Sequence, residues 1–173
     1  MQVPYVHYEQ STRCFQSEIR ELLACSRRTN VVSFGGGLPD ASLFPTGELA
    51  AVMEEVLSRS GHQALSYGPT VGEPCMLRSL ARHMADFDDP VDENHLLVTA
   101  SAQQGLDLLA MLFIDPGSDV LIERPSYVGA IQAFTRCGAH LHGIDLTPEG
   151  IDTDALEARI EVLRSLGRTP RLI

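Results

Sequence analysis

The sequence predicts an α/β protein whose parallel sheet is built from β-α-β units and is incomplete at the C-terminal end of the chain. From Leu96 onward, short apolar runs alternate with helical segments, which is the pattern of strands joined by crossover helices. The last residues, 170–173, are typical of the opening of another strand, with nothing after them to pair with it. The 173 residues, 44% of them hydrophobic, suffice for one core of ordinary size.

Residues 1–45 are expected to form an N-terminal arm, a helix and a glycine-rich loop. The helix, over 17–28, carries one apolar stripe and ends in a pair of arginines that suits a helix C-terminus. A short apolar run at 31–34 then stops at three glycines, Gly35, Gly36 and Gly37. Because glycine permits unusual backbone angles and close approach to a ligand, we expect a loop there.

Residues 46–173 are expected to form the first part of a larger domain. Thr46 is placed to cap a helix with apolar side chains at helical spacing, which Gly61 ends. Pro74 suits the first turn of the next helix, and an acidic loop at 86–94 follows it. The alternating region then predicts strands at 96–99, 120–122 and 139–144, and helices over 102–114, 127–136 and 154–166.

The charged residues exclude several classes of function. The chain carries 13 basic and 23 acidic side chains, a net charge of −10, and every basic residue is arginine. Without lysine, no side chain of this chain can form a Schiff base or act as a P-loop lysine. The negative balance argues against broad binding to nucleic acid or to anionic membranes.

The N-terminal segment, the histidines and the cysteines favour a cytoplasmic protein with neither disulfides nor a metal site. No leader-like segment occurs, and no apolar run approaches the ~18 residues of a membrane span. His140 and His142 could present two imidazoles from one strand face, but no third ligand lies near them in the sequence. No C-x-x-C spacing occurs among the four cysteines, Cys14, Cys25, Cys75 and Cys137.

Two strand ends are the places where a sheet of this class binds ligands. At 99–104, a predicted strand passes through small residues into a helix N-terminus, whose N–H groups suit a phosphate or a carboxylate. At 124–127, Pro125 stiffens the exit from the next strand and Tyr127 presents an aromatic face to a planar ligand. Simpler interpretations stay open: Ser101 as an N-cap alone, and Ser126 as an N-cap with Tyr127 half-buried.

Five motifs, in this order and spacing, resemble those of one family: Ser33–Pro39, Phe44-Pro45, Tyr67–Gly72, Thr99–Leu109 and Pro125–Ala130. The sequence is similar to fold type I pyridoxal-phosphate aminotransferases, specifically the 2-aminoadipate and kynurenine aminotransferase-like group. The resemblance runs from about Ser17 to the end of the chain and covers less than half of such an enzyme. It implies that 46–173 is the first part of a fold type I large domain that binds pyridoxal 5′-phosphate.

The resemblance also implies the residues of the cofactor site. Ser101, Ala102 and Gln103 would cradle the cofactor phosphate, and Tyr127 would stack on its pyridine ring. These are the two strand ends that the position of the apolar runs indicates independently. Ala102 stands where relatives often have serine, which leaves its backbone N–H as the only donor at that position.

Further residues would complete the site. By the same resemblance, Tyr67 would reach the neighbour's cofactor phosphate across a homodimer interface, and Arg20 and Gly37 would line the substrate side. The Schiff-base lysine, the aspartate that pairs with the pyridine nitrogen and the arginine that holds the substrate carboxylate would lie beyond Ile173. We therefore expect the N-terminal fragment of an enzyme that moves an amino group between an amino acid and a 2-oxo acid. The isolated chain would be inactive and would bind the cofactor weakly or not at all.

Two other classes stay open. One is a non-catalytic aminotransferase-like module that binds a ligand or forms dimers, as in some transcription regulators. A basic helix-turn-helix segment before Ser17 would favour it, and residues 1–16 are too few to contain one. The other is an unrelated doubly wound domain that binds a phosphorylated metabolite.

Overall fold

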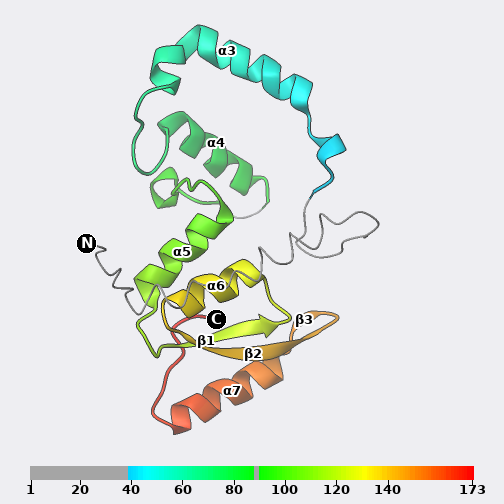
Figure 1. Ribbon diagram of the computed structural model, residues 1–173, viewed down its shortest axis with the longest axis vertical. Helices are drawn as coiled ribbons and strands as arrows, with labels where there is room; N and C mark the ends of the chain where they lie inside the picture. The colour runs from blue at the N-terminus through cyan, green and yellow to red at the C-terminus, as the bar shows by residue number, and fades with distance from the viewer. Residues whose placement is uncertain (1–38, 88–89) are drawn as a thin grey trace, which may run out of the picture. The chain divides into compact units, whose positions relative to one another are not determined.

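The computed structural model describes residues 39–87 and 90–173. These residues belong to two compact units, which meet in the sequence between Ala100 and Ser101 (Figure 1). The helix expected over 17–28, the apolar run at 31–34 and the glycine-rich loop lie outside the described residues. The division of the chain at residue 45 stays a prediction.

In the unit before Ser101, the first long helix is α3 (Thr46–Ala64), preceded by the short 3-10 turn η1 (Ala41–Leu43). The prediction that Thr46 caps α3 is wrong, because Pro45 holds the N-cap position and makes no side-chain hydrogen bond. The expected end at Gly61 is also too early. Ser60 leaves helical angles, with φ −145°, but helical turns resume and continue to Ala64.

The second helix of this unit begins where the sequence predicts. α4 (Pro74–Ala85) has proline in its first turn, where the missing N–H costs no hydrogen bond, and it buries Leu77. At the end of the acidic loop, Asp92 caps the short 3-10 turn η2 (Glu93–His95) by accepting a hydrogen bond from the Asn94 N–H.

The strand predicted at 96–99 is wrong. These residues are extended in part, but the Val98 N–H donates at 2.9 Å to the Val71 carbonyl, which belongs to a turn rather than to a neighbouring strand. The side chain of Val98 packs against Gly72, where an added Cβ would lie 2.7 Å from Val98 Cγ2. The apolar character of this run therefore serves packing against the turn at Gly72, not a sheet.

The unit from Ser101 to Ile173 contains the predicted parallel β-α-β arrangement. Strands β1 (Asp119–Arg124) and β2 (His140–Thr147) pair in parallel along six residues, and α6 (Val128–Arg136) connects them. The prediction of a parallel pair with a helical crossover is confirmed. In this register the carboxyl end of β1 lies beside Asp145 of β2.

The sheet has two additions to this pair. β2 turns through Gly150, whose φ of +131° favours glycine, into the two-residue strand β3 (Gly150–Ile151), which is antiparallel to β2 and was not predicted. At the other edge of β1, Leu172 forms a parallel bridge with Val120. The terminal run at 170–173 thus begins to pair in parallel, as expected of a strand.

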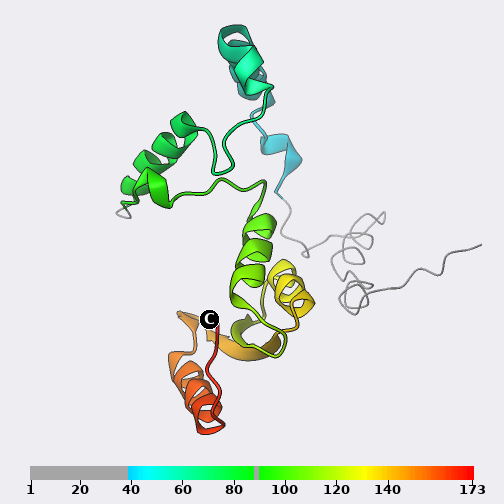
Figure 2. The same cartoon turned by 90° about the vertical axis from the view of Figure 1, so that its left-hand side faces the viewer.

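Helices cover both faces of this sheet. α5 (Ala102–Phe113) and α6 lie side by side in both views, and α7 (Thr153–Ser165) lies on the opposite side of β1 and β2 from α6 (Figures 1 and 2). The three helices agree with the predicted ranges to within one residue at each end. The core between α5, α6 and the sheet consists of buried Ala110, Ile114, Val120 and Ala133. None of the described helices is both long and apolar enough to cross a bilayer.

Candidate functional site

The N-terminus of α5 brings together three predicted residues. Ser101 is the N-cap in extended conformation, and its hydroxyl accepts a hydrogen bond from the Gln104 N–H at 3.4 Å. Ala102 and Gln103 follow in the first turn, where N–H groups have no carbonyl partner within the helix. The interpretation of Ser101 as an N-cap is confirmed. Its role toward an anion stays a prediction.

The second predicted place is the exit from β1. Arg124 and Pro125 are joined by a cis peptide bond, and Tyr127 follows with its side chain 59% exposed. Tyr127, not Ser126, holds the N-cap position of α6, and it makes no side-chain capping bond. The interpretation of Ser126 as the N-cap is therefore wrong, because the chain enters helical angles one residue later.

A contact between α5 and α6 joins these two places. The Gln103 side-chain amide donates to the Gly129 carbonyl at 3.1 Å, across 26 residues of sequence. A Cβ at Gly129 would overlap both Gln103 Oε1 and the Tyr127 ring, and would lie 2.8 Å from Tyr127 Cζ. The Gln103 side chain and the Tyr127 ring therefore meet at the same point of α6. Sequence reasoning missed Gly129, although a glycine in the first turn of a predicted helix is a signal of close packing.

Beside this place, an ion pair joins the two parallel strands. Arg124 donates two hydrogen bonds to Asp145, at 2.7 and 2.8 Å, and its stem packs over Gly143. The pairing lowers the pKa of Asp145 and raises the pKa of Arg124, in each case chiefly through the hydrogen bonds. Both side chains are well exposed, so the pair contributes little to stability.

The structure does not place the other predicted site residues relative to Ser101 and Tyr127. Tyr67 belongs to the unit before Ser101, in the loop between α3 and α4, and its side chain is fully exposed. Arg20 and Gly37 lie outside the described residues. The roles proposed for these three residues stay predictions.

At the opposite end of β1, a polar cluster surrounds one buried carboxylate. Asp119, 4% exposed, accepts hydrogen bonds from His142 Nε2 at 2.7 Å and from Arg168 Nε at 2.7 Å, with a further bond from Arg168 Nη2. Burial acts to raise the pKa of Asp119. The hydrogen bonds and charges of His142 and Arg168 outweigh burial, and the pKa lies below its ordinary value. Arg168 also lies 3.2 Å from His140 Nδ1.

This cluster accounts for the two histidines that alternate along β2. His142 is hydrogen-bonded to Asp119 of the neighbouring strand β1, and His140 faces the Arg168 guanidinium of the segment after α7. Over residues 39–87 and 90–173, no group of three or more His, Cys, Asp or Glu side chains is arranged to hold a metal ion. The two cysteines in this part of the chain, Cys75 and Cys137, are free thiols.

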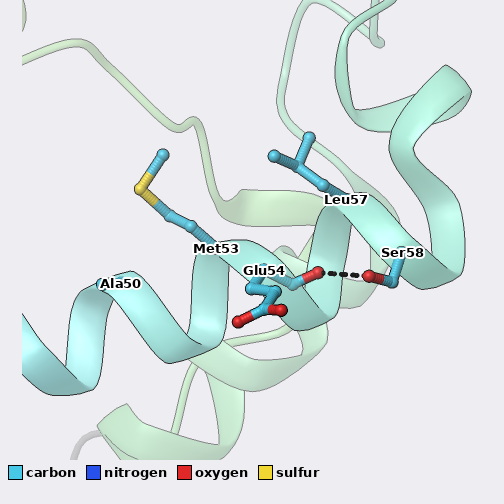
Figure 3. A pocket seen from close by; sticks show the side chains of 5 residues that line it. All are labelled: Ala50, Met53, Glu54, Leu57 and Ser58. Atoms are coloured by element: carbon cyan, nitrogen blue, oxygen red, sulfur yellow. Dashed lines mark hydrogen bonds between the residues drawn. The ribbon is translucent and has the colours of Figure 1, made fainter.

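An open groove runs along α3, and none of the predicted site residues lines it (Figure 3). The residues that line it are Ala50, Met53, Glu54, Leu57 and Ser58. All five belong to one helix, and the Ser58 hydroxyl donates a hydrogen bond to the Glu54 carbonyl of the same helix at 2.8 Å. The groove brings no two elements together and carries no convergent polar groups.

The residues at the α5 N-terminus and at Tyr127 fit a phosphorylated aromatic group. The donors at the start of α5 are a hydroxyl and main-chain N–H groups at the positive end of a helix, which is the chemistry that binds a phosphate dianion. Tyr127 adds an exposed ring, held where Gly129 leaves space for it. The fold and this pair of features are typical of α/β proteins that bind a phosphorylated ligand beside an aromatic side chain.

Comparison with known proteins gives the family. The family model for aminotransferase class I and II matches residues 30–167. The chain is 35% identical over 158 residues to aromatic-amino-acid aminotransferase 1 of Thermococcus litoralis, covering 91% of this chain and 38% of that protein. It is 42% identical over 148 residues to the 2-aminoadipate transaminase of Thermus thermophilus, covering 86% and 35%.

The fold agrees with this match. The crystal structure of an α-aminoadipate aminotransferase from Thermus thermophilus, complexed with N-(5′-phosphopyridoxyl)-L-leucine, is 39% identical with a TM-score of 0.80. The match covers 96% of this chain and 39% of that one. The chain belongs to the aminotransferase class I and II family, with the fold of the fold type I pyridoxal-phosphate enzymes. It spans less than two fifths of the length of the two curated relatives named above.

Proposed function

We propose that this chain supplies the cofactor-phosphate site of a pyridoxal-phosphate aminotransferase, which moves an amino group between an amino acid and a 2-oxo acid. The observation that carries the proposal is the meeting of the Gln103 side chain and the Tyr127 ring at Gly129. This contact joins an anion-binding helix N-terminus to an aromatic face. Membership in the aminotransferase family gives the class of ligand that needs both.

In this proposal each residue at the sheet edge has a distinct task. The Ser101 hydroxyl and the N–H groups of Ala102 and Gln103 bind the phosphate, whose negative charge the helix dipole stabilises. The Tyr127 ring stacks on one face of the pyridine. Pyridoxal phosphate, when bound, supplies a ring that accepts electrons from the substrate.

The proposal extends to residues that would act from elsewhere. Tyr67 would reach the cofactor phosphate of a second subunit in a homodimer, which agrees with its full exposure in the described unit. Arg20 and Gly37 would line the substrate side. We also propose a cytoplasmic protein, in agreement with the two free thiols at Cys75 and Cys137.

We expect no aminotransferase activity from the isolated chain. The family reaction needs a lysine to hold the cofactor and to move a proton, and the 173 residues contain none. The measurement is a coupled assay of 2-oxo acid formation with chain whose mass has been verified. Turnover above that of free pyridoxal phosphate would contradict this expectation.

A second candidate is a non-catalytic aminotransferase-like module that binds a ligand or mediates dimer formation. Such a module would keep the phosphate site without using it for catalysis. The two candidates differ in one respect: only the first predicts amino transfer when the rest of an aminotransferase is supplied.

The cofactor site is tested by hydrogen–deuterium exchange with pyridoxamine 5′-phosphate at millimolar concentration. This probe has no aldehyde, so it cannot react with the chain's α-amino group. We expect weak binding at this concentration, so that exchange slows in peptides that contain Ser101–Gln103 and Tyr127. Pyridoxamine, which lacks the phosphate, should not slow exchange in these peptides. Ser101→Ala should weaken the protection, whereas Ser165→Ala, which removes an exposed hydroxyl at the end of α7, should not. If the ligand slows exchange only in peptides that contain neither Ser101–Gln103 nor Tyr127, the proposed cofactor site is contradicted.

A further inference from the structure

We propose that the Gln103 side chain and Gly129 are a positioning pair, which holds the Tyr127 ring at a set place relative to the N-terminus of α5. The pair makes the site selective for a phosphorylated aromatic ligand over phosphate alone. This inference rests on the proposed cofactor site and adds two side-chain positions to it. Neither Gly129 nor the amide of Gln103 acts on a reacting atom.

The first step is the hydrogen bond between the two helices. Gln103 Nε2 donates to the Gly129 carbonyl at 3.1 Å, and this bond is partly buried. A buried amide that loses its partner costs free energy, so the bond opposes separation of the two helix starts. Gln103 also contributes one of the N–H groups at the phosphate position, so the same residue belongs to both parts of the site.

The second step is the absence of a side chain at residue 129. Gly129 is buried in α6, where its backbone is helical and glycine is less stable than alanine. Conformation therefore does not require glycine there, but space does. An added Cβ would overlap Gln103 Oε1 and the Tyr127 ring, and would displace one or both.

The third step is the consequence for the ring. Tyr127 lies at the N-cap of α6 with no hydrogen bond from its side chain to the helix, so capping does not orient it. Its ring packs against Gly129 on one side and is 59% exposed. The contacts at Gly129 and Gln103 therefore set where the exposed face lies relative to the donors of α5.

An ion pair provides a second connection between α5 and α6. Arg136 near the end of α6 pairs with Asp107 of α5, one to two turns beyond the Gln103 contact. The two helices are therefore joined at two places, and the spacing between their N-terminal ends is not set by one bond alone. Loss of the Gln103 bond should shift the Tyr127 ring without separating the helices.

The test uses the full chain labelled with 3-fluorotyrosine and observed by fluorine NMR. The four tyrosines give four signals, and Tyr127→Phe identifies the signal of residue 127. The variants are Gln103→Leu, which removes the bond at nearly constant volume, and Gly129→Ala. Gly105→Ala is the matched control, because a Cβ at that helical glycine meets nothing within 4 Å.

We expect the Tyr127 signal to move in Gln103→Leu and in Gly129→Ala but not in Gly105→Ala. The affinity for pyridoxamine 5′-phosphate, followed by the same signal, should fall about three- to tenfold, the effect of a lost aromatic contact. In Gly129→Ala, where the substituted residue is not one of the phosphate donors, the affinity for inorganic phosphate, followed by phosphorus NMR, should be unchanged. A general loss of folding would lower both affinities, so selectivity separates positioning from stability.

Two results distinguish failure of the positioning pair from failure of the proposed cofactor site. If the Tyr127 signal of Gln103→Leu equals that of the unsubstituted chain, the positioning pair is refuted, even if Gly129→Ala fails to fold. If pyridoxamine 5′-phosphate moves no signal of the unsubstituted chain, the cofactor site is refuted. The ligand-free spectra then still decide whether Gln103 and Gly129 hold the ring.

Discussion

Gly105 and Gly129 are both helical glycines, but they differ in the space available for a side chain. A Cβ at Gly105 meets nothing within 4 Å, whereas a Cβ at Gly129 overlaps Gln103 and Tyr127. We expect Gly105→Ala to raise the free energy of unfolding by about 0.5–1 kcal/mol through helix propensity. Gly129→Ala should lower it by about 1–3 kcal/mol through overpacking. Urea denaturation measures both, and equal shifts in the two variants would contradict the packing at residue 129.

Asp119 gives a prediction about how the free energy of unfolding depends on pH. Its pKa is lower in the folded chain than the ordinary 3.8, so its contribution to stability is complete above that value. The contribution is lost as the pH falls through the lower, folded pKa. Asp119→Asn should lower the free energy of unfolding by about 1.5–3 kcal/mol at neutral pH.

The pH dependence supplies the check for Asp119. Urea midpoints measured from neutral pH down to about pH 2 should fall more steeply for the unsubstituted chain than for Asp119→Asn, since the variant has no carboxylate to protonate. Asp145→Asn is the matched control, because its partner Arg124 is exposed and screened by solvent. Parallel curves for the unsubstituted chain and Asp119→Asn would contradict the role of Asp119.

At the scale of elements, the sequence predicts the helices better than the strands. Pro74 and Ser101 mark the starts of α4 and α5 because each has a local reason to stand at a helix N-terminus. Residues 96–99 are apolar without being a strand, since pairing depends on a neighbour that local pattern does not reveal. β3 escapes prediction because two residues carry no periodicity.

Some residues of the candidate site are predictable from the sequence, and others are brought together only by the fold. The position of Tyr127 follows from its place after the apolar run that forms β1, whereas Ser101 is located by its hydroxyl at the N-cap of α5, since the run before it is not a strand. Gly129 acts through Gln103, which lies 26 residues earlier, and only the packing of α5 against α6 brings them together. Asp119 and Arg168 are likewise 49 residues apart and meet only in the fold.

At the scale of the whole molecule, the described residues include many exposed large apolar side chains, and such side chains gathered on one surface mark an interaction site. α5 alone exposes Leu108, Leu109, Met111, Leu112 and Phe113, with Leu112 73% accessible. Burial of these side chains in a second copy or a partner would stabilise the association by the hydrophobic effect.

We therefore expect the isolated chain to self-associate as its concentration rises. Leu112→Glu should weaken the association, because it places a charge within the apolar face of α5. Ser165→Glu, which adds the same charge at the end of α7, should not. Sedimentation velocity over a range of concentrations is the measurement, and a single monomeric species for the unsubstituted chain at every concentration would contradict this prediction.

The most direct measurement of the proposed function is the turnover of a chimera. This chain replaces the matching segment of the Thermus thermophilus 2-aminoadipate transaminase, whose remaining part supplies the groups that this chain lacks, and amino transfer is assayed with pyridoxal phosphate. We expect a folded chimera to catalyse the transfer, with Tyr127→Ala lowering kcat/KM by roughly 10- to 100-fold. A folded chimera that holds no cofactor, or one whose rate is unchanged by Tyr127→Ala, would contradict the assignment of Ser101–Gln103 and Tyr127 as the cofactor site.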